Sequence, residues 1–117
     1  MAGNVITEEE KKYGIRITFN ECSRKLFCGL PEWLQISIAS VQSAIHRSVL
    51  QVFPGARSTS GFRCSCENVR VGGQYHSRHL FGLARDYSCS SDFPRDIPGC
   101  KVIVEKNCIH VELSHGD

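Results

Sequence analysis

The feature that most constrains the fold is an apolar stripe through the middle of the chain. Apolar residues recur three or four positions apart, the spacing of one helix face, at Leu34, Ile38, Val41, Ile45, Val49 and Val52. Pro31 suits the first helical position, and Glu32 beside it complements the helix dipole. The pair Pro54-Gly55 ends the pattern. The sequence therefore predicts a long amphipathic helix that must bury this face against another layer.

Short segments of β-favouring residues predict that second layer. Residues 14–19 (GIRITF) alternate apolar and polar side chains, and residues 56–64 and 83–88 suit short strands. Residues 101–113 (KVIVEKNCIHVEL) predict two strands joined by a tight turn near Lys106-Asn107. We therefore expect an α+β fold in which a small, mainly antiparallel sheet packs against the long helix, with a zinc site in a cleft on the sheet.

The remaining segments are less regular. Residues 1–13 read as an exposed arm or short helix, with Thr7 as N-cap and Glu10 as its capping-box partner. Residues 20–30 fit either a loop or a short helix, and the polar stretch 65–77 reads as a loop. A chain of 117 residues is one domain by length, so we expect a single domain over residues 1–117.

Composition excludes several classes of protein. A net charge of +2 lacks the clustered basic residues of a nucleic-acid-binding surface. The apolar stretches are short and interrupted by serines, so we expect no membrane span. The N-terminus has no basic region followed by an apolar core, so we expect no secretory signal and a cytoplasmic location in the producing cell. The oligomeric state is left open.

Seven cysteines are an unusual number for such a chain. Free thiols are the default in a reducing compartment. A structural zinc site at Cys64 and Cys66 is an alternative, although C-x-C is tighter than the usual spacing of paired zinc cysteines. Disulfides formed after export or lysis are a third.

The stretch 75–87 (YHSRHLFGLARDY) places a histidine and an aspartate on either side of a flexible turn. His79 and Asp86 can bind one metal ion only if the chain reverses between them, and Gly82 allows that reversal. Imidazole and carboxylate together suit zinc. Two ligands do not hold the ion, so a third must come from elsewhere.

His110 is the best candidate for the third ligand. On a strand, Cys108, His110 and Glu112 share one face, while the alternate apolar residues enter the core. His79, Asp86 and His110 would leave one zinc position for water, as in catalytic rather than structural sites. Zinc lowers the pKa of bound water to about 7, so a hydroxide nucleophile is available at neutral pH.

The string SGFRCSCENVRVGGQYHSRHLFGLARDY, followed by CIHVEL, resembles zinc peptidases of the D-alanyl-D-alanine carboxypeptidase type. That group includes L-alanyl-D-glutamate endolysins of phages, and the hedgehog signalling domain is a structural relative. The resemblance extends from Leu34 to Leu113, and its specific element is S-x-H-x-x-G-x-A-x-D. It implies a hedgehog-like zinc peptidase fold with His79, Asp86 and His110 as zinc ligands.

The same resemblance implies roles for two further residues. Arg63, in SGFR, matches the arginine that holds the substrate and polarises its carbonyl or binds its carboxylate. Ser77 would contact the substrate or brace the zinc loop.

One departure from the family pattern concerns the general base. These peptidases usually have a carboxylate three residues before the last zinc histidine, and here that residue is Asn107. Glu105 or Glu112 could serve instead, with Glu105 ranked first. The domain could also bind zinc without efficient turnover, or Asn107 could be an inactivating replacement. Cys108 is either an inert thiol or a fourth ligand that closes the site.

The sequence thus predicts zinc-dependent hydrolysis of peptidoglycan stem peptides, of D,D-carboxypeptidase or L,D-endopeptidase type, with zinc-bound water as the nucleophile. Such a protein would reach the cell wall after lysis or as part of a phage particle. The alternative is a weak or inactive zinc-binding relative that recognises a wall peptide or a protein partner. A stapled structural protein without a peptide role is the third hypothesis.

Overall fold

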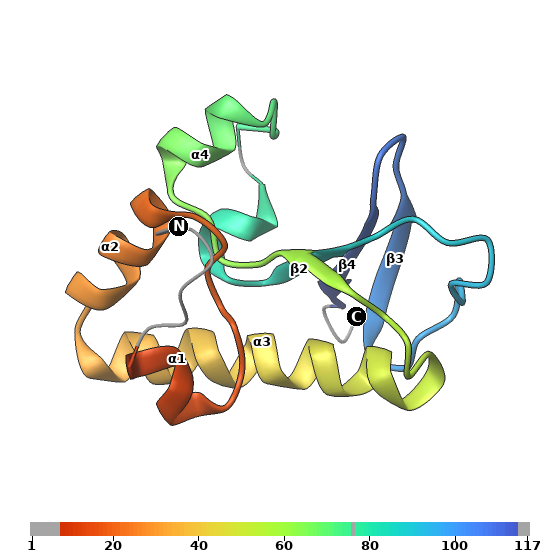
Figure 1. Cartoon of the computed structure of the whole chain (residues 1–117), viewed down its shortest axis with the longest axis horizontal. Coiled ribbons are helices and arrows are strands. Elements are labelled where there is room, and N and C mark those ends of the chain that lie inside the picture. Colours follow the sequence, from red (N-terminus) through yellow and green to blue (C-terminus); the bar gives the residue numbers. More distant parts are fainter. Residues whose placement is uncertain (1–7, 76, 115–117) are drawn as a thin grey trace.

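The frame of the molecule is a four-stranded antiparallel sheet beside one long helix (Figure 1). The computed structural model describes residues 8–75 and 77–114. The strand order is β1-β2-β4-β3, and the bounds are β1 Ser58–Ser60, β2 Ala84–Tyr87, β3 Cys100–Val104 and β4 Ile109–Leu113. The predicted α+β class and the small antiparallel sheet are confirmed, as is the β3–β4 hairpin.

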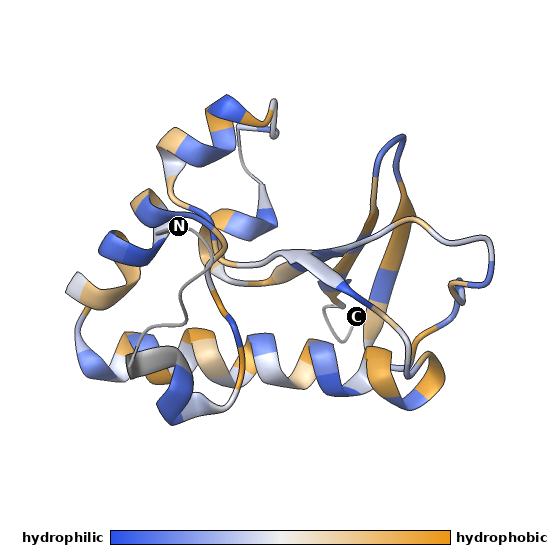
Figure 2. Ribbon diagram, in the orientation of Figure 1, coloured by the Kyte–Doolittle hydropathy of each residue, from blue (hydrophilic) through white to orange (hydrophobic). Residues whose placement is uncertain are grey.

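Helix α3 (Glu32–Val52) has 21 residues and runs beneath the sheet and α4 (Ser65–Arg70) in Figure 1. Pro31 is the N-cap of this helix rather than its first residue. The helix ends where Phe53 N–H bonds to Val49 O. Polar and apolar residues alternate along it in Figure 2. Its buried residues include two glutamines, Gln35 and Gln42, whereas Val52 is exposed in the last turn.

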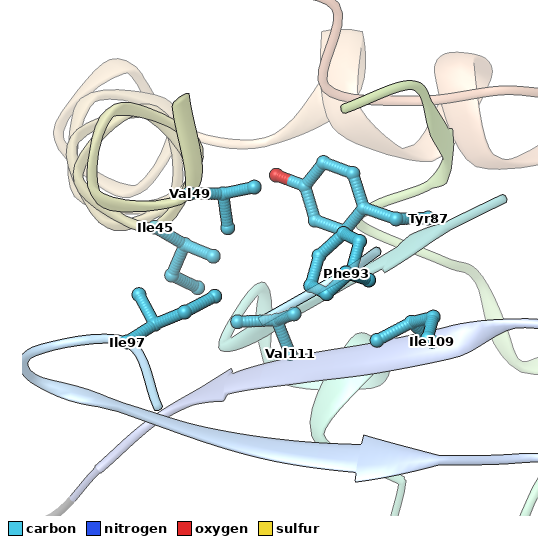
Figure 3. Close-up of a cluster of buried hydrophobic side chains, with 7 residues drawn as sticks. All are labelled: Ile45, Val49, Tyr87, Phe93, Ile97, Ile109 and Val111. Carbon is cyan, nitrogen blue, oxygen red and sulfur yellow. The ribbon is translucent and has the colours of Figure 1, made fainter. Parts of the chain in front are cut away.

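The main core lies between α3 and the sheet. Ile45 and Val49 of α3 face β2 and β4 across this core (Figure 3). The cluster consists of Ile45, Val49, Tyr87, Phe93, Ile97, Ile109 and Val111. Since successive residues of a strand point to opposite faces, His110 and Glu112, which alternate with Ile109 and Val111, are directed away from α3. This alternation sends polar side chains of β4 to the other face of the sheet.

A second core holds the N-terminal helices against the first half of α3. It consists of Ile17, Phe27, Ile38, Ala39 and Phe62. Phe27 belongs to α2 (Glu21–Gly29), which begins after the N-cap Asn20, so the helical alternative for residues 20–30 is the observed one. Helix α1 (Glu8–Tyr13) precedes it, while the predicted N-cap Thr7 lies outside the described residues.

Three local predictions were wrong or too broad. Residues 14–19 join no strand, because the carbonyl of Ile17 accepts from Phe62 N–H and that of Arg16 accepts from the Arg85 side chain rather than from a ladder. The strand predicted over 56–64 is only β1. The predicted loop 65–77 contains helix α4 (Ser65–Arg70), with Cys64 as N-cap, and the 3-10 helix η2 (Arg78–Phe81) follows it. Within residues 8–75 and 77–114, no helix combines the length and apolar character that a bilayer span requires.

Candidate metal centre

The chain reverses direction between His79 and Asp86. His79 lies in η2, which ends at Gly82 with φ of 73°, in the left-handed region that favours glycine. A Cβ at Gly82 would also lie 2.9 Å from a methyl group of Ile38. The reversal brings His79 Nε2 to 3.1 Å from Asp86 Oδ1. Ser77 caps η2, because its hydroxyl accepts a hydrogen bond from His79 N–H at 3.2 Å.

A buried glutamine of α3 forms hydrogen bonds to the backbone of this turn. Gln42 is fully buried, and its amide donates to the carbonyl of Gly82 at 2.6 Å and to that of Ala84 at 3.1 Å. Its side-chain oxygen accepts from Arg85 Nη1 at 2.9 Å. The helix therefore fixes the backbone on both sides of Leu83.

His110 reaches the same point from the neighbouring strand. Asp86 and His110 are direct partners in the β2–β4 register, so their side chains share a face of the sheet. His110 Nδ1 lies 3.2 Å from Asp86 Oδ1. The three possible ligand atoms of His79, Asp86 and His110 all lie within 4.8 Å of one another.

The outer nitrogen of each histidine is already bound. His79 Nδ1 donates to the carbonyl of Gly61 at 2.8 Å, and His110 Nε2 donates to Glu112 Oε1 at 2.9 Å. In the neutral imidazoles the inner nitrogens therefore carry lone pairs that face the Asp86 carboxylate. Three electron-pair donors turned toward one point require a cation between them, either protons or a metal ion. The N, N, O donor set and the oriented rings fit zinc.

The electrostatics of the cluster agree with this arrangement. Burial alone would raise the pKa of Asp86, but when protons rather than a metal ion occupy the inner nitrogens, hydrogen bonds from His110 and His79 hold it well below its usual range. Burial would lower the pKa of His110, yet its bonds to Asp86 and Glu112 raise it above the ordinary value. Asp86 is thus an ionised carboxylate that attracts positive charge.

Arg63 forms the next part of the site. It is only 6% exposed, its backbone N–H bonds to His79 O, and its Nη2 lies 3.5 Å from Asp86 Oδ2. Nη1 donates to Asn68 Oδ1 at 3.2 Å. Gly73 lets the following loop approach, because a Cβ there would lie 2.1 Å from Asn68 Oδ1. Burial lowers the pKa of Arg63 and the nearby Asp86 opposes that shift, but an arginine stays protonated.

These groups open onto a cavity of about 900 Å³. All the predicted site residues contribute to its lining, which includes Arg63, Ser77, His79, Asp86, Glu105, Asn107, His110 and Glu112. The structure therefore brings these eight predicted site residues together, whereas Cys64 and Cys66 of the alternative site are not part of this lining; the roles of all of them remain predictions.

The three candidates for proton transfer differ in their surroundings. Glu112 is bound to His110 and lies 3.6 Å from Arg78 Nε, so it orients the histidine. Glu105 is exposed at the end of β3, and one of its oxygens lies within 4.8 Å of a carboxylate oxygen of Asp86. Asn107 is exposed in the turn between β3 and β4.

Cys108 is a protonated thiol beside this cluster. Its Sγ–H donates to Glu105 Oε1 at 3.2 Å. Burial, together with the charges of Asp86 and Glu105, raises the pKa of Cys108 to about 12. The thiol therefore keeps its proton near neutral pH while no metal ion is bound.

Sequence reasoning missed the groups that hold the proposed ligands in position through hydrogen bonds. The carbonyl of Gly61 and the side chain of Gln42 have no motif of their own, since one is a backbone group and the other reads as a break in an apolar stripe. Glu112 was noticed only as a candidate base. Its place two residues after His110 on one strand face could have indicated an orienting partner.

Comparison with known families identifies one match. Residues 55–101 match the model of the family described as Peptidase M15. The matched segment contains Arg63, Ser77, His79 and Asp86, and it ends before His110. This match supports the zinc peptidase family M15 and a metallopeptidase activity. Searches of curated proteins and of solved structures return no significant match.

Proposed function

We propose that this chain is a zinc-dependent peptidase that hydrolyses peptide bonds in peptidoglycan stem peptides. The observation that carries the proposal is the convergence of His79, Asp86 and His110 on one wall of a cavity that Arg63 also lines. The family match to residues 55–101 supports the peptidase class. The substrate class comes from the resemblance of the motif to that of peptidases that cut the bacterial wall.

His79, Asp86 and His110 would hold the metal ion, and Glu112 and the Gly61 carbonyl would keep the two rings in position. Zinc, when bound, supplies Lewis-acid activation of water and of the scissile carbonyl. The histidines reach this geometry through the fold rather than through the metal alone, because backbone and side-chain acceptors already orient them.

Arg63 would bind the substrate carbonyl or carboxylate. Its guanidinium is held by Asn68 and by the carboxylate of Asp86, so it stays fixed and charged at the cavity wall. A preorganised cation of this kind stabilises negative charge that develops on a substrate oxygen. Ser77 would brace η2, because its oxygen accepts from His79 N–H, and it also lines the cavity.

Glu105 is our candidate for the group that accepts and returns a proton. It lines the cavity, and its carboxylate lies close to Asp86 without being bound to either histidine in the hydrogen bonds of the described residues. Glu112 already accepts a hydrogen bond from His110 Nε2, and the amide of Asn107 does not titrate.

Asn107 favours a second candidate function. It stands where related peptidases have a carboxylate, so the domain could bind zinc and a wall peptide or protein partner without efficient hydrolysis.

The test is digestion of purified peptidoglycan by the zinc-loaded protein, with mass spectrometry of the released fragments. We expect fragments whose masses identify the bond that is cut, and their loss on addition of a chelator and in His110→Ala. Restoring zinc should restore cleavage in the wild type only. Intact peptidoglycan in the presence of the stoichiometrically zinc-bound wild type would reject hydrolysis of this substrate. A binding assay with the same peptidoglycan would then test the second function.

A further inference from the structure

Two cysteines from distant parts of the sequence meet beside the site. Cys22 lies in the first turn of α2, and Cys64 is the N-cap of α4. Their Sγ atoms are 3.0 Å apart although the residues are 42 positions apart in sequence. Both are free thiols.

The fold holds these two sulfurs in place from both sides. The backbone N–H of Cys64 donates to the Ser23 hydroxyl at 3.0 Å, and Ser23 N–H in turn donates to Asn20 Oδ1 at 3.1 Å. Glu67 N–H donates to Cys64 Sγ at 3.3 Å, which fixes the sulfur at the start of α4. The approach of α2 to α4 therefore does not depend on a bond between the sulfurs.

The two thiols differ in access. Cys64 is 5% exposed, whereas Cys22 is exposed. A small reagent therefore reaches Cys22 first, and the buried sulfur of Cys64 lies in contact with that of Cys22. This is the arrangement of an attacking thiol with an adjacent resolving thiol.

We propose that Cys22 and Cys64 form a reversible disulfide that fastens α2 to the loop carrying Arg63. The oxidant is a low-molecular-weight disulfide such as oxidised glutathione. The Cys22 thiolate attacks it, forming a mixed disulfide and releasing one glutathione thiolate. The Cys64 thiolate then attacks the Cys22 sulfur and expels the second. The protein loses two electrons and two protons, and oxidised glutathione becomes two molecules of reduced glutathione.

The electrostatics support the second step, the attack by Cys64. Burial would raise the pKa of Cys64, but hydrogen bonds from Cys22 and from the backbone of Glu67 lower it overall. The neighbouring Cys64 and Cys66 raise the pKa of Cys22, to about 11. The pair thus favours the thiolate on Cys64, the sulfur that closes the disulfide.

The disulfide would stabilise the folded chain and restrict one loop of the site. It would close a long loop of the unfolded chain, which is the case in which a cross-link stabilises most. Cys64 directly follows Arg63, so the bond would also restrict the segment that positions the guanidinium. The inference does not depend on the proposed peptidase activity.

The experiment equilibrates the purified full-length chain with reduced or oxidised glutathione, alkylates the remaining thiols and maps the tryptic peptides. Cleavage after lysine and arginine gives residues 17–24 with Cys22 and residues 64–70 with both Cys64 and Cys66. We expect a linked pair of these peptides in the oxidised wild type and its disappearance on reduction. Absence of the linked pair in oxidised glutathione would overturn the proposal.

Variants assign the partner, because Cys64 and Cys66 share a peptide. Cys66→Ser and the distant Cys89→Ser should keep the linked pair, and Cys64→Ser should lose it. A linked pair that survives Cys64→Ser but is lost in Cys66→Ser would overturn the assignment. Serine at position 64 can still cap α4, so this variant is expected to fold.

Thermal unfolding gives an independent readout. Oxidation should raise the melting temperature of the wild type and of Cys89→Ser by roughly 5–15 °C. It should leave that of Cys22→Ser unchanged. An equal rise in Cys22→Ser would show that another oxidation causes the shift and would contradict the stabilising effect.

Discussion

Two walls of the same cavity are built in different ways. The first wall, called the sheet wall, carries His79 of η2, Asp86 of β2 and His110 of β4. These side chains are largely buried, and each histidine is oriented through its outer nitrogen. On the hairpin wall, Glu105 and Asn107 are exposed near the tip between β3 and β4, which is hydrophilic in Figure 2. The proposed metal ligands are thus part of the folded frame, whereas the candidate proton carrier lies on a turn. The two functions should be separable by mutation.

The largest expected effect is on the sheet wall. His110→Ala removes one of three proposed ligands, so we expect loss of stoichiometric zinc and of all peptidase activity. Metal analysis after dialysis, with circular dichroism to confirm folding, measures this. Full zinc content in a folded His110→Ala protein would mean that the ion lies elsewhere, and Cys64→Ser tests the alternative thiolate site.

The second-largest expected effect distinguishes proton transfer on the hairpin wall from metal binding on the sheet wall. Glu105→Gln keeps the shape of the side chain but removes proton transfer, so we expect a loss in kcat of about 10²–10⁴-fold with unchanged zinc content. Asn107→Ala is the matched control on the same turn, and it should change kcat by much less. If Asn107→Ala were as damaging as Glu105→Gln, the turn as a whole rather than one carboxylate would be required.

A smaller effect concerns the partner behind His110. Glu112→Ala removes the acceptor for His110 Nε2–H and should weaken zinc binding by about 10–100-fold. Glu112→Gln keeps an accepting oxygen and should lose less. Competition with a chromophoric chelator gives both affinities. A loss of kcat in Glu112→Gln at saturating zinc, with normal zinc affinity, would instead indicate a direct role in proton transfer.

The smallest predicted effect is a dependence of zinc affinity on pH. The pKa of His110 is raised above its ordinary value in the metal-free protein, so its protonation begins to compete with zinc above pH 6.5. Affinity should therefore be full at high pH and fall as the pH is lowered from 8 to 6. A chelator competition series across this range measures it.

His46 provides the control for that series. Burial lowers its pKa to about 4, so it stays neutral between pH 8 and pH 6. His46→Gln should show the same pH dependence as the wild type. Equal affinity at pH 8 and pH 6 in the wild type would mean that the proposed ligand does not titrate in the expected range.

Much of this arrangement follows from local pattern. The β3–β4 hairpin was predictable because alternation and a polar turn are both visible in residues 101–113. The approach of His79, Asp86 and His110 was predictable because the glycine between the first two permits a reversal and the strand period places the third on a polar face.

The errors come from segments whose hydrogen bonds are tertiary. Residues 14–19 have a strand-like pattern but join no ladder among the described residues, and Ile17 O instead accepts from Phe62 N–H. Helix α4 was missed because Cys64, an uncommon N-cap, begins it. The buried Gln42 falls within a face that pattern alone treats as apolar.

Gln42 also has a consequence for how such a domain can vary in length. Its amide ties α3 to the carbonyls of Gly82 and Ala84, one on each side of a single residue. An inserted or deleted residue there would break one tie and shift Asp86 out of its pairing with His110. The turn at 105–108 has no such tether to the helix among the described contacts. Inserted sequence at the hairpin tip should therefore leave folding and zinc binding intact, whereas insertions between His79 and Asp86 should abolish zinc binding.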